Sequence, residues 1–547
     1  MAVDEDSEAS RAPLLHDTAD NSYGSTHRVV TRVDNETASE SHGHGEQFDN
    51  VPKDKRKLGL FSAASLIFNR LIGTGIFATP SLILHASGSV GVALCMWLCG
   101  AVIAAIGTTV YIELGSALPR SGGEKNYLEY IFRKPAFLVT CIFAVYALIM
   151  GSSASNSLVF SEYFLNALSV DATPFHTRVT AFICLTLCAF LQGTSVRTGL
   201  FLQNTLAVFK LVLLLFFVVS GLLALLGILP PTEYPLPSHP FRRPFEGSTT
   251  DASVLISGMY NVIWAFVGYN AANSALSEVR NPVWTVKRAA PLALGTVTVV
   301  YLLVNVAYFA VVEKADILSG RRIVAALFFR NLFGKSAERI LSLCISLSTL
   351  GNLLGGHFHQ GRMLQELGRE GTVPYASFFA SSQPFGAPLA ALAFQWAFNV
   401  ILIVLPPESD AYAFMINLSS YCNNIVGVAV ALGLVLLSSS LLPFTSYKWD
   451  PPFKASRVVV VTFMLVNVFL LAMPFVPPKD GRGYYQNMPY YAHALAGCLL
   501  SIIGVIYWYL WSRIMPSLGK YRLERDWVVG EDGVGRNVFK RVGRGIQ

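Results

Sequence analysis

Charged residues are scarce in this sequence. Only 14% of its 547 residues are Asp, Glu, Lys or Arg, whereas soluble domains carry about 25%. Hydrophobic residues make up 53%, and they gather in runs of roughly 20, the length at which a helix crosses a bilayer. The sequence also has no nucleotide-binding loop, no cluster of metal ligands and no nucleophile paired with a base. These absences favour a membrane protein that is not an enzyme and needs neither a cofactor nor a metal.

The cysteines show no sign of a disulfide framework. There are eight, and most lie within apolar runs, where cysteine acts as a small apolar residue. These are Cys95, Cys99, Cys141, Cys184, Cys188, Cys344 and Cys498. The net charge of +7 comes from basic loops and does not indicate a nucleic-acid partner.

The two ends of the chain differ from the apolar middle. Residues 1–57 are rich in Ser, Thr, Asp, Glu, His and Asn and cannot bury enough apolar surface to fold, so we predict a disordered tail. This tail lacks the apolar core of a cleavable signal peptide, and we expect the first apolar run to act as the insertion signal. We place a membrane domain at 58–515 and a second tail at 516–547.

Twelve apolar runs predict twelve transmembrane helices. Their approximate centres are Gly73, Ala101, Ala147, Leu185, Leu214, Ala265, Val300, Gly351, Phe398, Gly427, Leu465 and Ile503. An even number of spans places both termini on one side, and the Lys and Arg in alternate loops place that side in the cytoplasm. The basic segment 314–335 is an exception. Its apolar residues follow a helical period, which predicts a surface helix across the outer face.

The first and sixth runs are interrupted at matching positions. Gly73 and Gly75 flank Thr74 in the first, and Gly268 precedes Tyr269 and Asn270 in the sixth. Glycine in a helix interior costs about 1 kcal/mol relative to alanine, and irregular backbone at membrane depth is tolerated only where it lines a cavity or is buried in protein. Close helix packing is one explanation for such glycines. Broken helices at corresponding places in two inverted five-helix repeats, with a solute site between them, are the other.

The motifs resemble those of amino acid–polyamine–organocation transporters, and within them the L-type branch. The residues that carry the resemblance are Gly73 to Phe77 with Pro80, Tyr111 to Gly115 with Pro119, Ser121 to Gly123 with Tyr127 and Leu128, Phe266 to Asn270 with Glu278, Val279, Asn281 and Pro282, and Gly361 and Arg362 with Arg369 to Gly371 and Pro374. Asn69, Arg70 and the segment from Ala78 to Ser81 look most like fungal methionine permeases.

The resemblance implies a fold and bears on whether a partner protein is bound by a disulfide. It implies an all-α membrane protein of twelve helices, with a five-plus-five inverted repeat in which helices 1 and 6 are broken and two further helices follow. In the animal L-type light chains, a cysteine between helices 3 and 4 bonds a glycoprotein partner. The corresponding loop here, residues 166–177, has no cysteine, so we expect no disulfide-linked heavy chain.

A zwitterionic amino acid needs donors for its carboxylate and acceptors for its ammonium. Backbone N–H groups at the start of the second half of helix 1 would meet the carboxylate at a positive helix end, and exposed carbonyls at both breaks would meet the ammonium. The candidate residues are Ile72, Gly73, Thr74, Gly75, Ile76, Phe266, Val267, Gly268, Tyr269 and Asn270. Trp264 matches the family position of an aromatic gate. Ser155, Asn156 and Asn352 are further candidates, for which a helix-packing role is an equal alternative.

Lys210 lies deep inside the fifth run. An ionisable residue at such depth costs about 2.5–3.5 kcal/mol even on lenient scales, which makes it a functional candidate, although a lysine that snorkels to the rim is the alternative. It matches a fifth-helix lysine of sodium-independent members of the superfamily. That match implies coupling to protons and argues against sodium. For His357 and His359 we favour packing roles over titration.

Two carboxylates near helix ends have a plainer interpretation. For Glu113 and Glu278 we expect a gate or an ion pair with Arg120, Arg280 or Arg362. The leading functional hypothesis is import of a neutral amino acid, methionine or cysteine, by proton symport across the plasma membrane. The alternatives are a sodium-independent exchanger and a receptor that binds amino acid without transport. Leu14 and Leu15 leave a vacuolar location as an alternative.

Overall fold

Helices make up most of the part of the chain that the structure describes. In the computed structural model, the described residues are 56, 58–119, 122–228, 237, 241–319, 324–383, 385–407, 410–439, 449–478, 485–529 and 535–543. The predicted N-terminal tail, apart from Arg56, lies outside these residues. So do Arg120 and the di-leucine pair Leu14–Leu15.

The helices follow the predicted order. They are α1 (Leu60–Leu71), α2 (Gly75–Ser87), α3 (Val90–Ala117), α4 (Glu124–Ile131), α5 (Leu138–Met150), α6 (Ala154–Ala167), α7 (Pro174–Thr194), α8 (Val196–Leu225), α9 (Ala252–Ala265), the 3-10 helix η2 (Ala271–Glu278), α10 (Pro282–Val311), α11 (Lys314–Ser319), α12 (Val324–Glu370), α13 (Ala376–Ala380), α14 (Leu389–Val404), α15 (Ala411–Ser438), α16 (Arg457–Ala472), η3 (Met473–Phe475), α17 (Ala492–Tyr509), the π-helical turn η4 (Leu510–Ile514) and α18 (Met515–Leu518).

Apolar helices are found at all twelve predicted centres, although not all of them are long enough to be counted as spans. Among the described residues, nine helices are long and apolar enough to cross a bilayer, and the bent pair α1 and α2 makes a tenth. The shorter apolar helices α9 and α14 contain the sixth and ninth centres. On α8, exposed apolar side chains recur at helical spacing, at Phe201, Val208, Val212 and Leu215. Such a stripe is typical of a surface that faces lipid.

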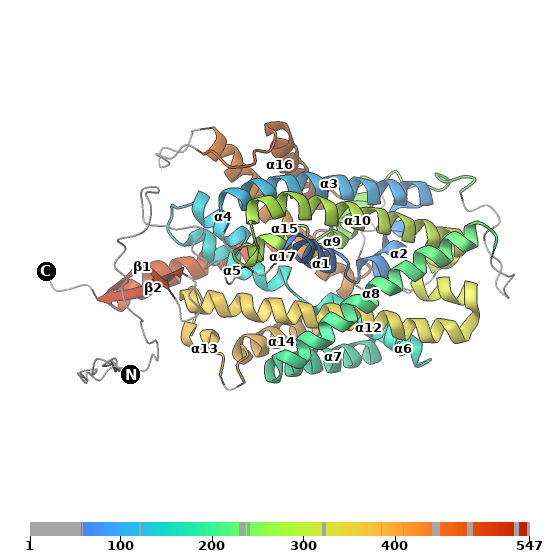
Figure 1. Ribbon diagram of the computed structural model, residues 1–547, viewed down its shortest axis with the longest axis horizontal. Helices are drawn as coiled ribbons and strands as arrows, with labels where there is room; N and C mark the ends of the chain where they lie inside the picture. Colours follow the sequence, from blue (N-terminus) through green and yellow to red (C-terminus); the bar gives the residue numbers. More distant parts are fainter. Residues whose placement is uncertain are drawn as a thin grey trace, which may run out of the picture. The chain divides into compact units, whose positions relative to one another are not determined.

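The helices pack in two groups. In the first, α1 packs against α10, α2 against α9, and α10 against α3. In the second, α6, α7, α12 and α14 pack against one another. Helix α8 contacts both α10 and α12, and Figure 1 shows it running across α12 beside α10. The first group contains both predicted breaks, and contacts of α12 with α2 and α10 join it to the second group.

The predicted surface helix is present but more deeply packed than expected. Its described part is α11 and the first turns of α12, which end at a break at Gly334 with φ of 82°. Val324 and Phe328 are fully buried, and the Phe328 ring packs against Phe217 of α8 and Tyr308 of α10. The apolar face that suggested contact with the membrane surface therefore packs against the bundle itself.

A β-hairpin follows the last helix, in the region where we predicted only a tail. Strands β1 (Tyr521–Val529) and β2 (Gly535–Gly543) pair antiparallel, with Tyr521 opposite Gly543. Phe539 of β2 packs against Phe137 and Trp511, with ring centroids 4.8 and 5.7 Å away. The many charges in this segment concealed the strands in the sequence.

Candidate functional site

The first transmembrane span is broken where the sequence predicted. Helix α1 ends at Leu71 and α2 begins at Gly75, and their axes differ by 45°. The first N–H groups of a helix have no acceptor inside it, so the start of α2 offers donors at this point. The backbone here is closed in, because Ile72, Thr74 and Ile76 are fully buried.

The glycines of this break serve close packing as well as the break. A Cβ on Gly75 would lie 2.8 Å from the Cβ of Ala265, and a Cβ on Gly73 would lie 2.8 Å from Nδ2 of Asn352. The two explanations that the sequence left open therefore both hold. Only a residue without a side chain lets α2 approach α9 and α12 so closely.

The second break lies beside the first. Helix α9 ends at Ala265, and the chain passes through Gly268, whose φ is 122°, before η2 begins at Ala271. Tyr301 of α10 joins the two breaks, because its hydroxyl donates to the carbonyls of Leu71 at 2.7 Å and Ala265 at 3.1 Å. Nothing in the sequence indicated this role, since a tyrosine in an apolar run is usually a packing residue.

Lys210 reaches the first break. Its side chain is buried, and Nζ donates to the carbonyl of Ile72 at 2.6 Å. The alternative of a lysine that snorkels to the rim is therefore excluded in this structure. The carbonyl that we expected to accept from a substrate ammonium accepts here from the ammonium of a lysine.

The remaining candidates fall on two sides of the breaks. The Thr74 hydroxyl donates to Oδ1 of Asn156 at 2.5 Å, so the Asn156 side chain of α6 lies beside the start of α2. Its neighbour on α6, Ser155, is buried. The Trp264 ring lies 6.4 Å from that of Tyr412 and within 3.5 Å of a Cβ at Gly75. On the other side, Asn270 donates to Glu124 at 2.8 Å.

Tyr269 packs away from the first break. Its ring lies 5.7 Å from the Tyr111 ring, and its hydroxyl would be 2.9 Å from a Cβ on Gly107. This glycine of α3 therefore makes room for the phenol. Phe266 also packs inward, against Trp97 and Tyr301, and is almost fully buried.

A cavity of about 1300 Å³ extends from the start of α1 to the breaks. Of the predicted site residues, those that line it are Lys210, Val267, Gly268, Asn270 and Asn352. The sequence did not indicate Arg70, Glu124 or Gln203 as cavity residues. The cavity reaches the breaks from the side at which α1 begins, which we call the α1 side.

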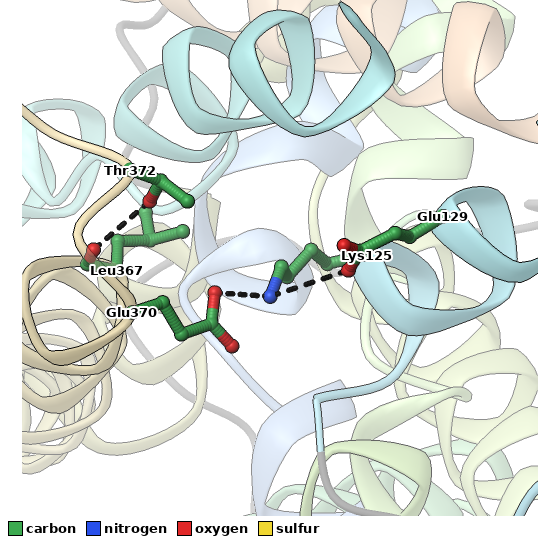
Figure 2. A network of polar contacts seen from close by, with 5 residues as sticks. All are labelled: Lys125, Glu129, Leu367, Glu370 and Thr372. Atoms are coloured by element: carbon green, nitrogen blue, oxygen red, sulfur yellow. Dashed lines mark hydrogen bonds and ion pairs between the residues drawn. The ribbon is translucent and has the colours of Figure 1, made fainter. Parts of the chain in front are cut away.

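An ion-pair cluster borders the cavity on the α1 side. Lys125 of α4 pairs with Glu370 at the end of α12 and with Glu129, the latter at 3.6 Å (Figure 2). Thr372 donates to the carbonyl of Leu367 at 2.9 Å and so ends α12 beside this cluster. The cluster links α4 to the end of α12.

Glu124 lies next to this cluster but has different partners. Its Oε1 accepts from the Tyr111 hydroxyl of α3 and from the Asn270 amide. Burial raises the pKa of the Glu124 carboxyl, although these two hydrogen bonds oppose the shift. The described residues contain no group of three His, Cys, Asp or Glu side chains that could hold a metal ion.

The expected ion pair of Glu113 was wrong. Its carboxylate accepts from Nε1 of Trp449 at 2.9 Å and from the backbone N–H of Ala455 at 2.8 Å. Glu113 thus ties α3 to the segment before α16. The side chain of Glu278 lies outside the description. His357 bonds the Leu353 carbonyl within its own helix at 2.9 Å, which agrees with a packing role.

Comparison with known proteins agrees with this architecture. The profile of the amino acid permease family matches residues 58–503. The high-affinity methionine permease of Saccharomyces cerevisiae is 40% identical over 512 residues, which cover 93% of this chain and 88% of that protein. The low-affinity methionine permease of the same yeast is 28% identical over 508 residues, with coverage of 92% and 90%.

A more distant relative extends the match to the L-type branch. The human b(0,+)-type amino acid transporter 1 is 28% identical over 468 residues, which cover 84% of this chain and 90% of that protein. The resemblance that the motifs indicated is thereby confirmed. With the family profile matched over most of its length and 40% identity to a permease across 93% of its residues, the chain belongs to the amino acid permease family.

Proposed function

We propose that this permease imports a neutral L-amino acid, methionine above all, across the plasma membrane by alternating access. The observation that carries the proposal is the junction of the two helix breaks, where Lys210 and Tyr301 hold the carbonyls of Ile72, Leu71 and Ala265. The choice of methionine is supported by the yeast relatives named as methionine permeases.

The substrate would bind by its backbone groups at the breaks. Its carboxylate would accept from the first N–H groups of α2, at Thr74, Gly75 and Ile76, where the positive end of the helix dipole favours an anion. Its ammonium would be held by carbonyls of the two breaks. The side chain would lie toward Trp264 and Tyr412, whose rings offer the apolar and polarisable contacts that a thioether prefers.

Protons would drive the import through Lys210. A charged Lys210 donates to the Ile72 carbonyl, and a neutral one would donate more weakly, so that the substrate ammonium could compete for that carbonyl. Loading and release of one proton would thus change the site itself. In this proposal the Lys210 ammonium fills the space that a sodium ion occupies in sodium-coupled relatives, which argues against sodium coupling.

We propose the location and assembly on the basis of the same family membership. With both termini in the cytoplasm, the α1 side would face the cytoplasm and the cavity would open inward. The loop 166–177 has no cysteine, so the protein would work without a disulfide-linked partner. A non-reducing gel of the protein from intact cells tests this, and a band that shifts on reduction would contradict it.

Uptake of radiolabelled methionine tests the proposed function. Cells without their own carriers would express the protein or K210A, with K335A as the matched control because Lys335 lies on α12 outside the cavity. We expect uptake to be faster at pH 5 than at pH 7.5 and to lose this dependence in K210A alone. Uptake that needs a preloaded amino acid would instead indicate an exchanger. Binding without uptake by surface-exposed protein would indicate a receptor.

A further inference from the structure

The charged side chains that line the cavity are almost all paired. Lys125 pairs with Glu370, and Arg369 pairs with Glu366 at 2.5 Å. Lys210 bonds the Ile72 carbonyl, and the Arg362 guanidinium lies 3.4 Å over the ring of Phe358. Two groups of opposite charge remain, Arg70 and Glu124.

Arg70 is the cation of this cavity without an acceptor. It lies in the last turn of α1 and lines the cavity, and no carboxylate or hydrogen-bond acceptor within the described residues bonds its guanidinium. In the open cavity, water can solvate the guanidinium, but closing the cavity would remove this water and leave a costly unpaired charge.

Within the described part of the chain, no cation pairs with Glu124, a carboxylate that lines the cavity. Its two hydrogen bonds, from Tyr111 and Asn270, both end on Oε1. A carboxylate has about four lone-pair sites on its two oxygens, so Oε2 can accept a guanidinium while Oε1 keeps its present partners. Lys125, the neighbouring cation on α4, is already held by Glu370 and Glu129.

The two groups contact the same short segment. The Arg70 side chain lies against Gly268, where a Cβ would be 2.6 Å from Cγ of the arginine. Two residues later, Asn270 holds Glu124. Gly268 therefore provides room for the arginine to move along this segment, and its φ of 122° suits glycine alone among common residues.

We propose that Arg70 and Glu124 form the ion pair that closes the cavity on the α1 side. Arg70 lies on α1 in the first helix group, whereas Glu124 lies on α4, which the Lys125–Glu370 pair links to α12 of the second group. A swing of the α1 end toward α4 would bring the guanidinium to Oε2 of Glu124. The gate rests on the alternating access of the proposed function, but it concerns residues that the binding of substrate does not require.

A static role for Arg70 is the competing explanation. A cation in the last turn of α1 is also favourable toward the helix dipole. A dipole role needs only a positive charge at position 70, whatever stands at position 124. A gate needs opposite charges at both positions, so exchanging the two charges separates the explanations.

The test measures how often the cavity is open. Ser65 of α1 lines the cavity, and the rate at which a membrane-impermeant maleimide modifies S65C, applied from each side of the membrane, reports access. The protein without S65C corrects for the native cysteines. We expect R70Q and E124Q each to raise the rate several-fold, and R70E/E124R to restore it. R369Q is the matched control, because Arg369 is a cavity arginine already paired with Glu366, and its rate should stay within a factor of two.

A second measurement keeps the proposal testable if the R70E/E124R variant does not fold. In R70C/E124C, a short bifunctional thiol reagent should join the two positions when the cavity closes. R70C/E129C serves as the control, since Glu129 faces Lys125, and should not be joined. Unchanged modification of S65C in R70Q and E124Q, or no cross-link in R70C/E124C, overturns the gate. Methionine uptake by the S65C parent, measured alongside, shows separately whether the proposed function fails.

Discussion

The two helix breaks differ in how their backbone groups and neighbouring side chains are bonded. At the break between α1 and α2, Ile72 and Thr74 are fully buried, and the carbonyls of Ile72 and Leu71 accept from Lys210 and Tyr301. The break after α9 lines the cavity at Val267, Gly268 and Asn270, and it bonds a carboxylate of α4. The first break is therefore built as a fixed binding surface. The second is built as the link between the site and the parts that must move.

Glycine substitution at the first break should have the largest effect. In G75A the new Cβ would meet the Cβ and Cα of Ala265 at 2.8 and 3.0 Å. Because a backbone atom cannot yield as a flexible side chain can, we expect a loss of about 1–3 kcal/mol in unfolding free energy and loss of uptake. Thermal unfolding in detergent and methionine uptake measure both effects.

Gly295 of α10 is the control for this comparison. A Cβ there would meet nothing within 4 Å, so G295A should gain up to about 1 kcal/mol from helix propensity and keep its uptake. If G75A were tolerated as well as G295A, close approach of α2 to α9 would not be what the first break requires.

The hydroxyl that joins the breaks should have the next largest effect. Y301F removes one donor from two buried carbonyls, at Leu71 and Ala265. The Leu71 carbonyl keeps the N–H of Gly73 as a donor, but the Ala265 carbonyl would lose its side-chain donor, and a buried polar group left without a partner costs about 1–3 kcal/mol. Losing the link should also slow uptake. Y507F removes a comparable hydrogen bond, the 2.6 Å bond from the Tyr507 hydroxyl to the Thr372 carbonyl. This carbonyl belongs to neither break. Y507F should lower stability but preserve uptake, and equal uptake in Y301F and Y507F would refute the link.

The carboxylate at the second break should make stability depend on pH. Burial raises the pKa of Glu124, so its contribution to stability is complete below its unfolded pKa of about 4.3 and is lost as pH rises through the raised value. Glu124 faces Tyr111, Tyr127 and Tyr269, and Lys125 lies next to it. E124Q should remove this part of the pH dependence of the melting temperature. A melting curve of E124Q that varies with pH as the parent does would contradict the assignment.

The sequence predicted the breaks but not the bonds that hold them. Glycine at membrane depth is a local signal, so the interruptions at Gly73 to Gly75 and at Gly268 were found from spacing alone. Lys210 was also evident, because a charge in an apolar run is costly wherever it packs. Tyr301 gave no such signal, since its role depends on which carbonyls lie opposite it, and these come from helices far away in the sequence.

The charges at the helix ends show the same limit more sharply. The expected ion pair of Glu113 was wrong because the indole N–H of Trp449 and the N–H of Ala455 satisfy the carboxylate instead. Arg70 and Glu124 stood among several charges near the ends of spans. The structure separates these two from the others, because it shows which of the charged side chains already have partners.

The smallest effect is expected from the hydroxyl of Thr74, and it tests whether the first break is a fixed surface. The hydroxyl donates to Oδ1 of Asn156, and the side chain of Asn156 is only partly buried, so water can replace the bond in T74V. We expect a loss of about 1 kcal/mol or less in stability and a rise in KM for methionine, because the bond orients the start of α2 where the substrate carboxylate would bind. T74S keeps the hydroxyl and should match the parent in both measurements. An unchanged KM in T74V would mean that the backbone alone, held by Lys210 and Tyr301, sets the geometry of the first break.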